Sequence, residues 1–115
     1  MSKKIVGNYL RAHRRTRGLS QRELALLVGY KNEWQVSRHE LAKTIPPLTI
    51  ALAYEVVFEV PVAQLFKEVH SIATAAVALN FAELRAVVER QTAKQPLGRM
   101  AGHKLKWLRE RSTMQ

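Results

Sequence analysis

The sequence contains no cysteine and no aspartate, so all nine of its acidic residues are glutamates. The lack of cysteine excludes a disulfide framework and thiolate chemistry. No glutamate or serine stands at a usable catalytic spacing from a histidine, and the five glycines form no phosphate-binding loop. The four isolated histidines are His13, His39, His70 and His103. We therefore expect a protein that is not an enzyme, has no catalytic residues and holds no metal or cofactor.

Long hydrophobic runs are also missing, since none approaches about 18 residues. We therefore expect no transmembrane helix and no membrane partner. The basic start is not followed by the apolar core of a signal peptide, which favours a cytoplasmic location. A hydrophobic content of 47% over 115 residues is enough for a compact core.

Negative charge is scarce, with 19 lysines and arginines against nine acids and a net charge of +10. The surplus is concentrated at the two ends. Residues 1–18 hold six cations and no acid, and residues 96–115 hold five cations and one acid. Such a surplus favours a polyanion partner, nucleic acid before membrane, over a basic surface that is merely solvated.

Residues 19–29 have the pattern of a short, well-terminated helix. Their apolar positions follow the i, i+3, i+4 spacing of one helix face: Leu24, Leu27 and Val28. Ser20 is a good N-cap, and Glu23 stands three residues later, as a capping box requires. Gly29 can adopt the left-handed conformation that ends a helix. A second short helix is expected over about 32–41, with Val36 pointing inward, which completes the outline of a helix-turn-helix.

The segments GLSQRELALLVGY (18–30) and QVSRHE (35–40) resemble the DNA-binding domain of the Cro/repressor (XRE) family. The resemblance covers roughly residues 6–67. It implies an all-α fold with a five-helix, lambda-repressor-like helix-turn-helix domain. From Gly29 to Val36 there are seven steps, one more than the family pattern usually shows, so we expect a longer turn. His39 stands where the family commonly has a large apolar residue, and we interpret it as a neutral imidazole half-buried against the first helix.

The remaining elements are expected from periodicity and breaks. Four further helices are predicted at about 5–17, 47–58, 60–66 and 69–94, and a basic tail helix at 99–111. The helix at 47–58 is apolar on most sides and should be the most buried, and Leu65-Phe66 should close the core. We expect a DNA-binding domain over 1–67 and, over 68–115, a helical extension for dimerisation with a basic tail.

The resemblance implies which side chains contact DNA, because the second helix of the motif lies in the major groove. It places base contacts at Glu33, Trp34, Gln35 and Arg38. Contacts to a base or a phosphate fall at Gln21, Asn32 and Ser37, and phosphate contacts at Lys31, Lys43 and Arg22. Arg38 suits guanine, whereas Trp34 either touches a thymine methyl or packs over the turn. The family also implies an internal ion pair between Arg14 and Glu40.

The long helix at 69–94 is apolar over a broad arc and would extend past a five-helix core. We predict that Phe81, Leu84, Val87 and Val88 form a homodimer interface. In the competing arrangement the tail folds back and covers this strip through Leu105, Trp107 and Leu108.

These expectations favour a sequence-specific, double-stranded-DNA-binding transcription regulator, a homodimeric repressor found at the nucleoid when bound to DNA. The alternative is an antitoxin-type interaction module that neutralises a protein partner and autoregulates its operon. A third interpretation makes the basic tail a membrane-surface segment.

Overall fold

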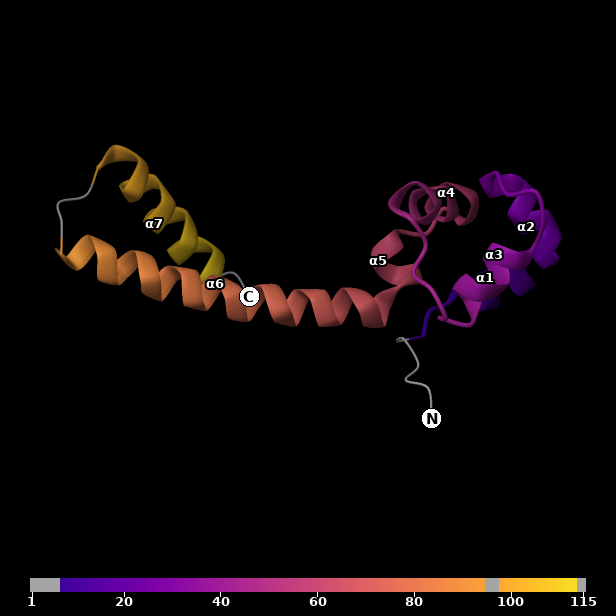
Figure 1. Ribbon diagram of the computed structural model, residues 1–115, viewed down its shortest axis with the longest axis horizontal. Coiled ribbons are helices and arrows are strands. Elements are labelled where there is room, and N and C mark those ends of the chain that lie inside the picture. Colours follow the sequence, from indigo (N-terminus) through magenta and orange to yellow (C-terminus); the bar gives the residue numbers. More distant parts are fainter. Residues whose placement is uncertain (1–6, 95–97, 114–115) are drawn as a thin grey trace. The chain divides into compact units, whose positions relative to one another are not determined.

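The computed structural model describes residues 7–94 and 98–113, and all the regular structure in them is helical (Figure 1). The helices are α1 (Leu10–Thr16), α2 (Gln21–Val28), α3 (Trp34–Glu40), α4 (Leu48–Phe58), α5 (Val62–Leu65), α6 (Lys67–Lys94) and α7 (Arg99–Thr113). The expected all-α fold, with its long helix and tail helix, is confirmed. The chain divides into two compact units, residues 1–71 and 72–115, and each is described by itself.

Two helices begin later than the sequence predicted, and in each an asparagine two residues earlier accepts a hydrogen bond from the N–H of the first helical residue. α1 begins at Leu10 rather than near residue 5, and the Asn8 side-chain oxygen accepts a hydrogen bond from the Leu10 N–H at 3.1 Å. α3 begins at Trp34 rather than near Asn32, whose side-chain oxygen accepts from the Trp34 N–H at 3.0 Å. Residues 5 and 6 of the predicted first helix lie outside the described residues.

The predicted ends of α2 are confirmed. The Ser20 hydroxyl accepts from the Glu23 N–H at 3.0 Å, and the Glu23 carboxylate accepts from the Ser20 N–H at 2.8 Å. Hydrogen bonds from the backbone and side chain of Ser20 lower the pKa of Glu23. Gly29 ends the helix at φ 100°, a left-handed conformation that glycine adopts without a Cβ clash.

The core of the first unit holds α2 and α3 in place. α2 packs against α3 and α4, and α1 also packs against α3 and α4. The buried side chains of this core are Leu10, Leu24, Ala25, Val28, Val36, Tyr54, Phe58, Leu65 and Phe66. The expected closure by Leu65-Phe66 is therefore confirmed, while Leu27 is 57% exposed and does not join the buried face.

α4 is not the most buried element, and this prediction is wrong. Its buried residues are Ala51, Tyr54 and Phe58. On other sides Leu48, Leu52 and Val56 are 73%, 45% and 76% exposed. An even distribution of apolar residues around the helix does not show which side the neighbours cover. In this fold α1, α2 and α5 cover only part of it.

In the second unit α7 runs back alongside the second half of α6 (Figure 1). Val88, Leu105 and Leu108 form a small buried core with Phe81 packed against it. The Phe81 and Trp107 rings lie 5.2 Å apart between centroids, and the Arg111 guanidinium lies over the Phe81 ring. The tail helix α7 therefore covers Phe81 and Val88 within the same chain, as in the competing arrangement, because its apolar side chains pack against them. Leu84 and Val87 remain 45% and 38% exposed.

α6 is, by length and composition alone, able to cross a membrane, and only 6% of its most apolar 18-residue stretch is buried. The sequence prediction of no transmembrane helix considered only uninterrupted apolar runs. This stretch also contains polar residues and no more than two charged ones. Composition of this kind is also typical of a helix that packs against a partner.

Candidate nucleic-acid interface

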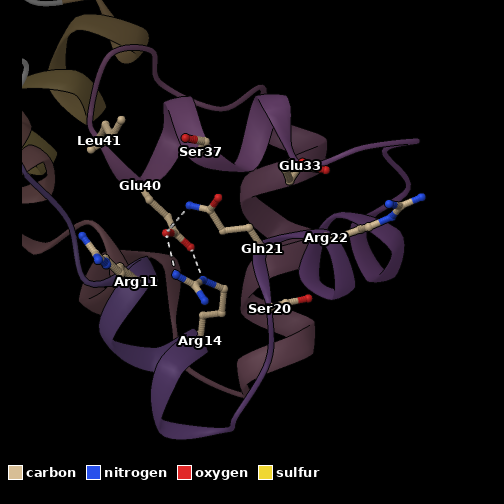
Figure 2. Close-up of a pocket in the computed structure, with 9 residues that line it drawn as sticks. All are labelled: Arg11, Arg14, Ser20, Gln21, Arg22, Glu33, Ser37, Glu40 and Leu41. Atoms are coloured by element: carbon tan, nitrogen blue, oxygen red, sulfur yellow. Dashed lines mark hydrogen bonds and ion pairs between the residues drawn. The ribbon is translucent and has the colours of Figure 1, made fainter.

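α1, α2 and α3 border an open pocket of about 540 Å³ on the surface of the first unit (Figure 2). Nine residues line it: Arg11, Arg14, Ser20, Gln21, Arg22, Glu33, Ser37, Glu40 and Leu41. A second pocket of about 370 Å³ shares part of this lining and consists of Gln21, Asn32, Glu33, Trp34 and Ser37. The start of α2 and the start of α3 therefore present polar side chains on one surface.

Five of the predicted DNA contacts come together there: Glu33 and Trp34, predicted to contact bases, and Gln21, Asn32 and Ser37, predicted to contact a base or a phosphate. Trp34 is 66% exposed, so its ring is not buried over the turn. Among the predicted phosphate contacts Arg22 lines the larger pocket. Four predicted contacts line neither pocket, namely the exposed Lys31, Gln35 and Lys43 and the partly buried Arg38.

Arg14 and Glu40 lie beneath this surface as a close ion pair. Arg14 Nε lies 2.6 Å from Glu40 Oε2, and Arg14 Nη2 donates to Glu40 Oε1 at 3.1 Å. The Arg14 side chain is 11% exposed and that of Glu40 is 1% exposed. Arg14 also donates to the Leu19 carbonyl at 2.8 Å. The pair thus connects α1, the α1–α2 loop and α3.

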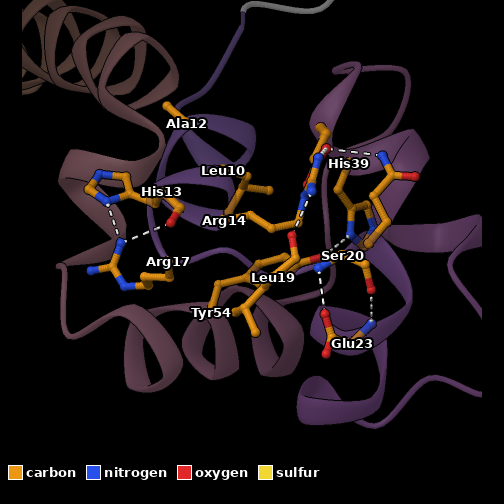
Figure 3. A network of polar contacts seen from close by, with 12 residues as sticks. Leu10, Ala12, His13, Arg14, Arg17, Leu19, Ser20, Glu23, His39 and Tyr54 are labelled. Carbon is orange, nitrogen blue, oxygen red and sulfur yellow. Dashed lines mark hydrogen bonds and ion pairs between the residues drawn. The ribbon is translucent and has the colours of Figure 1, made fainter.

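Ser20 and Leu41 also line the larger pocket and were not among the predicted contacts. Arg11 lines it too, and it belongs to the arginine cluster of the first helix, which was expected to contact the DNA backbone. Arg11 is an exposed cation three residues before Arg14, which places both on one face of α1. Arg17, by contrast, has a structural partner: its guanidinium donates to the Phe58 carbonyl at 2.8 Å and lies 4.9 Å from the Phe58 ring centroid. Figure 3 shows its further bonds to His13.

His39 anchors the inner side of α3. Its side chain is fully buried, and Nδ1 lies 2.8 Å from the Tyr54 hydroxyl on α4 (Figure 3). The expected half-burial against the first helix is therefore wrong, because the ring points into the core toward α4. Burial lowers the pKa of His39, and the positive charge of Arg38 lowers it further. Burial also raises the pKa of Tyr54, which keeps its hydroxyl protonated.

We expect the first unit to lose stability when the pH falls below about 6.5, the ordinary pKa of histidine. The folded state holds His39 with a lowered pKa, so in this range the unfolded state binds more protons. This stability is complete above about pH 6.5 and is lost toward the lowered pKa. Urea unfolding of wild type at about pH 7.5 and about pH 5.5 measures the loss.

The His39→Gln variant should not show this pH-dependent loss, whereas His103→Gln, at an exposed position in α7, should retain it. The same loss of stability in wild type and in His39→Gln contradicts the assignment.

Residues 10–65 match the family model described as helix-turn-helix. The match begins with α1 and ends with α5. No curated protein and no solved structure matches the chain. Within the described ranges 7–94 and 98–113, no three histidine or glutamate side chains are grouped so that they could hold a metal ion.

Proposed function

We propose that this DNA-binding transcription regulator acts as a sequence-specific, homodimeric repressor in the cytoplasm. Its residues 10–65 are a helix-turn-helix domain of the Cro/repressor (XRE) family. The observation that supports sequence-specific binding is the polar surface at the starts of α2 and α3. There Gln21, Asn32, Glu33 and Ser37 provide donors and acceptors suited to base edges.

Cations beside this surface suit the phosphates that flank a major groove. Arg11 and Arg22 line the larger pocket. Lys31 lies three residues before α3 and Lys43 three residues after it, and both are exposed. Contacts of this kind set affinity and its salt dependence, whereas contacts to base edges set sequence preference.

The Arg38→Ala variant should weaken binding to the preferred duplex by about 1–3 kcal/mol while keeping most non-specific binding, because it removes a bidentate contact to guanine. Binding of the full chain to the preferred duplex and to a scrambled duplex measures both. The matched control is Lys43→Ala, which should weaken both duplexes alike. If Arg38→Ala also weakens both alike, Arg38 is a phosphate contact.

The dimer is supported by an apolar stripe on α6. Val77, Leu84 and Val87 are 46%, 45% and 38% exposed, and their spacing of seven and three residues places them along one side of the helix. An exposed stripe of this length calls for a partner, and a second copy of α6 presents the same surface. Leu84 and Val87 are two of the four predicted interface residues. The other two, Phe81 and Val88, pack against α7.

The Leu84→Glu variant should convert a dimer into folded monomers and weaken operator binding, because it places a charge within the stripe. Leu79→Glu is the matched control: Leu79 is 70% exposed on the same helix, about 140° around it from Leu84, and should remain dimeric. Sedimentation equilibrium at high micromolar concentration measures the mass. A monomeric wild type rules out this dimer.

The same stripe would serve an antitoxin-type module that holds a protein partner. A stoichiometric partner that copurifies with wild type, and is lost in Leu84→Glu, favours that alternative. Binding of the monomeric chain to anionic vesicles would instead favour a membrane-surface role for α6 or the tail.

A further inference from the structure

α7 lies outside residues 10–65, the part of the chain that the helix-turn-helix family model covers. It carries most of the positive charge of the second unit. Its charged residues are five cations and one acid, and all six are exposed: Arg99, Lys104, Lys106, Arg109, Arg111 and Glu110. The DNA contacts proposed above all lie in the first unit and do not use this charge.

Two of these cations contact α6. Arg109 Nε lies 3.3 Å from Glu89 Oε1, and the Arg111 guanidinium lies 5.0 Å from the centroid of the Phe81 ring. Unpaired cations gathered on one helix attract a polyanion more strongly than cations that neighbouring acids neutralise. The described part of the chain provides no carboxylate partner for the other three cations, which are Arg99, Lys104 and Lys106.

Arg99 and Lys106 lie on the side of α7 that faces away from α6. They are seven residues apart, which places them within about 20° of each other around the helix and about 10 Å apart along it. The exposed His103 lies between them. The buried Leu105 and Leu108 lie about 120° and 180° around the helix from Arg99. α7 therefore has an apolar side against α6 and a basic side open to solvent.

The same packing argues against a membrane as the ligand of this basic side. A helix that binds in the plane of a membrane inserts a broad apolar face beneath the lipid headgroups. In α7 that face is Leu105 and Leu108, and both are buried. Met100 and Trp107 are exposed, but Trp107 also packs against Phe81, and the two do not replace the covered face. A row of cations without a free apolar face suits duplex DNA, which carries about one negative charge per 1.7 Å of its axis.

We propose that the basic side of α7, formed by Arg99, His103 and Lys106, is a second DNA-binding surface that contacts the phosphate backbone without reading its sequence. The first unit brings the chain to duplex DNA, so a second surface on the same chain meets phosphates at a high effective concentration. Such contacts raise affinity for every duplex and leave the preferred site unchanged. The inference rests on DNA binding by the helix-turn-helix and not on the proposed sequence specificity.

The first test measures DNA binding by the full chain over a range of salt concentrations. In Arg99→Gln and Lys106→Gln, affinity for the preferred duplex and for a scrambled duplex should fall by the same factor, about three- to tenfold at about 0.1 M salt. The slope of log K against log salt should become shallower by about 1 in each variant and by about 2 in the double variant. Selection from random duplexes should return the wild-type site, because no base contact changes.

The charge-matched control for each single variant is Arg90→Gln. Arg90 is exposed on α6, about 180° around that helix from Phe81, and so lies on the side away from α7. The control removes the same charge and should change affinity and slope much less. If it weakens binding as much as Arg99→Gln and Lys106→Gln do, or if those variants bind as wild type does, the inference is overturned.

The second test places a DNA-cleaving probe on the same side of α7. The chain has no cysteine, so iron–EDTA on a thiol-reactive linker attaches only where a cysteine is introduced. On His103→Cys the probe should cleave the bound duplex. On Glu83→Cys it stands on α6, about 160° around that helix from Phe81, and most of this cleavage should be lost. No cleavage from His103→Cys, or equal cleavage from both, contradicts the proposed surface.

Lipid phosphates are the other source of the same chemistry, and vesicles of phosphatidylcholine and phosphatidylglycerol test it. If wild type binds these vesicles, Arg99→Gln/Lys106→Gln does not, and both bind DNA equally, the ligand is a membrane and the inference is overturned. If wild type selects no sequence from random duplexes, the proposed specificity is wrong. The effects of the α7 variants on scrambled DNA would still test the second surface in that case.

Discussion

Replacing Glu40 with leucine is expected to destabilise the first unit by about 3–5 kcal/mol, because it leaves the charge of Arg14 buried without its partner. Arg14 is 11% exposed and would keep only the Leu19 carbonyl among the contacts described above. Arg14→Met should cost a similar amount, since it leaves the Glu40 carboxylate buried. Urea unfolding at neutral pH measures both variants.

The double variant should be less destabilised than the sum of the two single variants, because it leaves no unpaired charge. The coupling free energy should reach at least about 1 kcal/mol. Arg11→Met is the matched control: it removes an exposed arginine one turn earlier on α1 and should change stability by less than about 0.5 kcal/mol. Additive effects of the two variants would contradict a coupled pair.

Replacing Leu108 with alanine is expected to destabilise the second unit by about 2–5 kcal/mol, toward the lower end because the surrounding core is small. Leu108 is fully buried and shares this core with Val88 and Leu105. The bond between Arg109 and Glu89 lies at the surface, with side chains 55% and 39% exposed, and does not replace that burial. Apolar packing is therefore the main interaction between α7 and α6.

Hydrogen exchange resolves this effect along the chain. In Leu108→Ala the α7 amides should exchange faster, while amides in α2 and α4 should keep their wild-type rates because they belong to the other unit. The matched control is Met100→Ala, whose side chain is 78% exposed on the same helix and should have no effect. Faster exchange in α2 would show that the two units unfold together.

The features that could be predicted from the sequence are those that depend on neighbouring residues. The capping box of Ser20 and Glu23 and the left-handed Gly29 need only the local order of residues, and both are present. The length of α6 follows from its alanine content and the absence of glycine and proline. The helix-turn-helix as a whole could be recognised because these signals occur together.

What could not be predicted depends on which faces meet in three dimensions. The apolar pattern of α4 is nearly uniform, so it did not show that Leu48 and Val56 would be exposed. The apolar arc of α6 did not show that α7 would cover Phe81 and Val88. Gln21 and Glu40 are 19 residues apart, and only the packing of α1, α2 and α3 brings their side chains together.

Selection of binding sites from random duplex DNA by the full chain tests the central claim most directly. The account predicts enrichment of one twofold-symmetric site, with half-sites about one helical turn apart, that the chain binds at least about a thousandfold more tightly than scrambled DNA. Equal binding to the selected and scrambled duplexes, with affinity that depends only on salt, would contradict it.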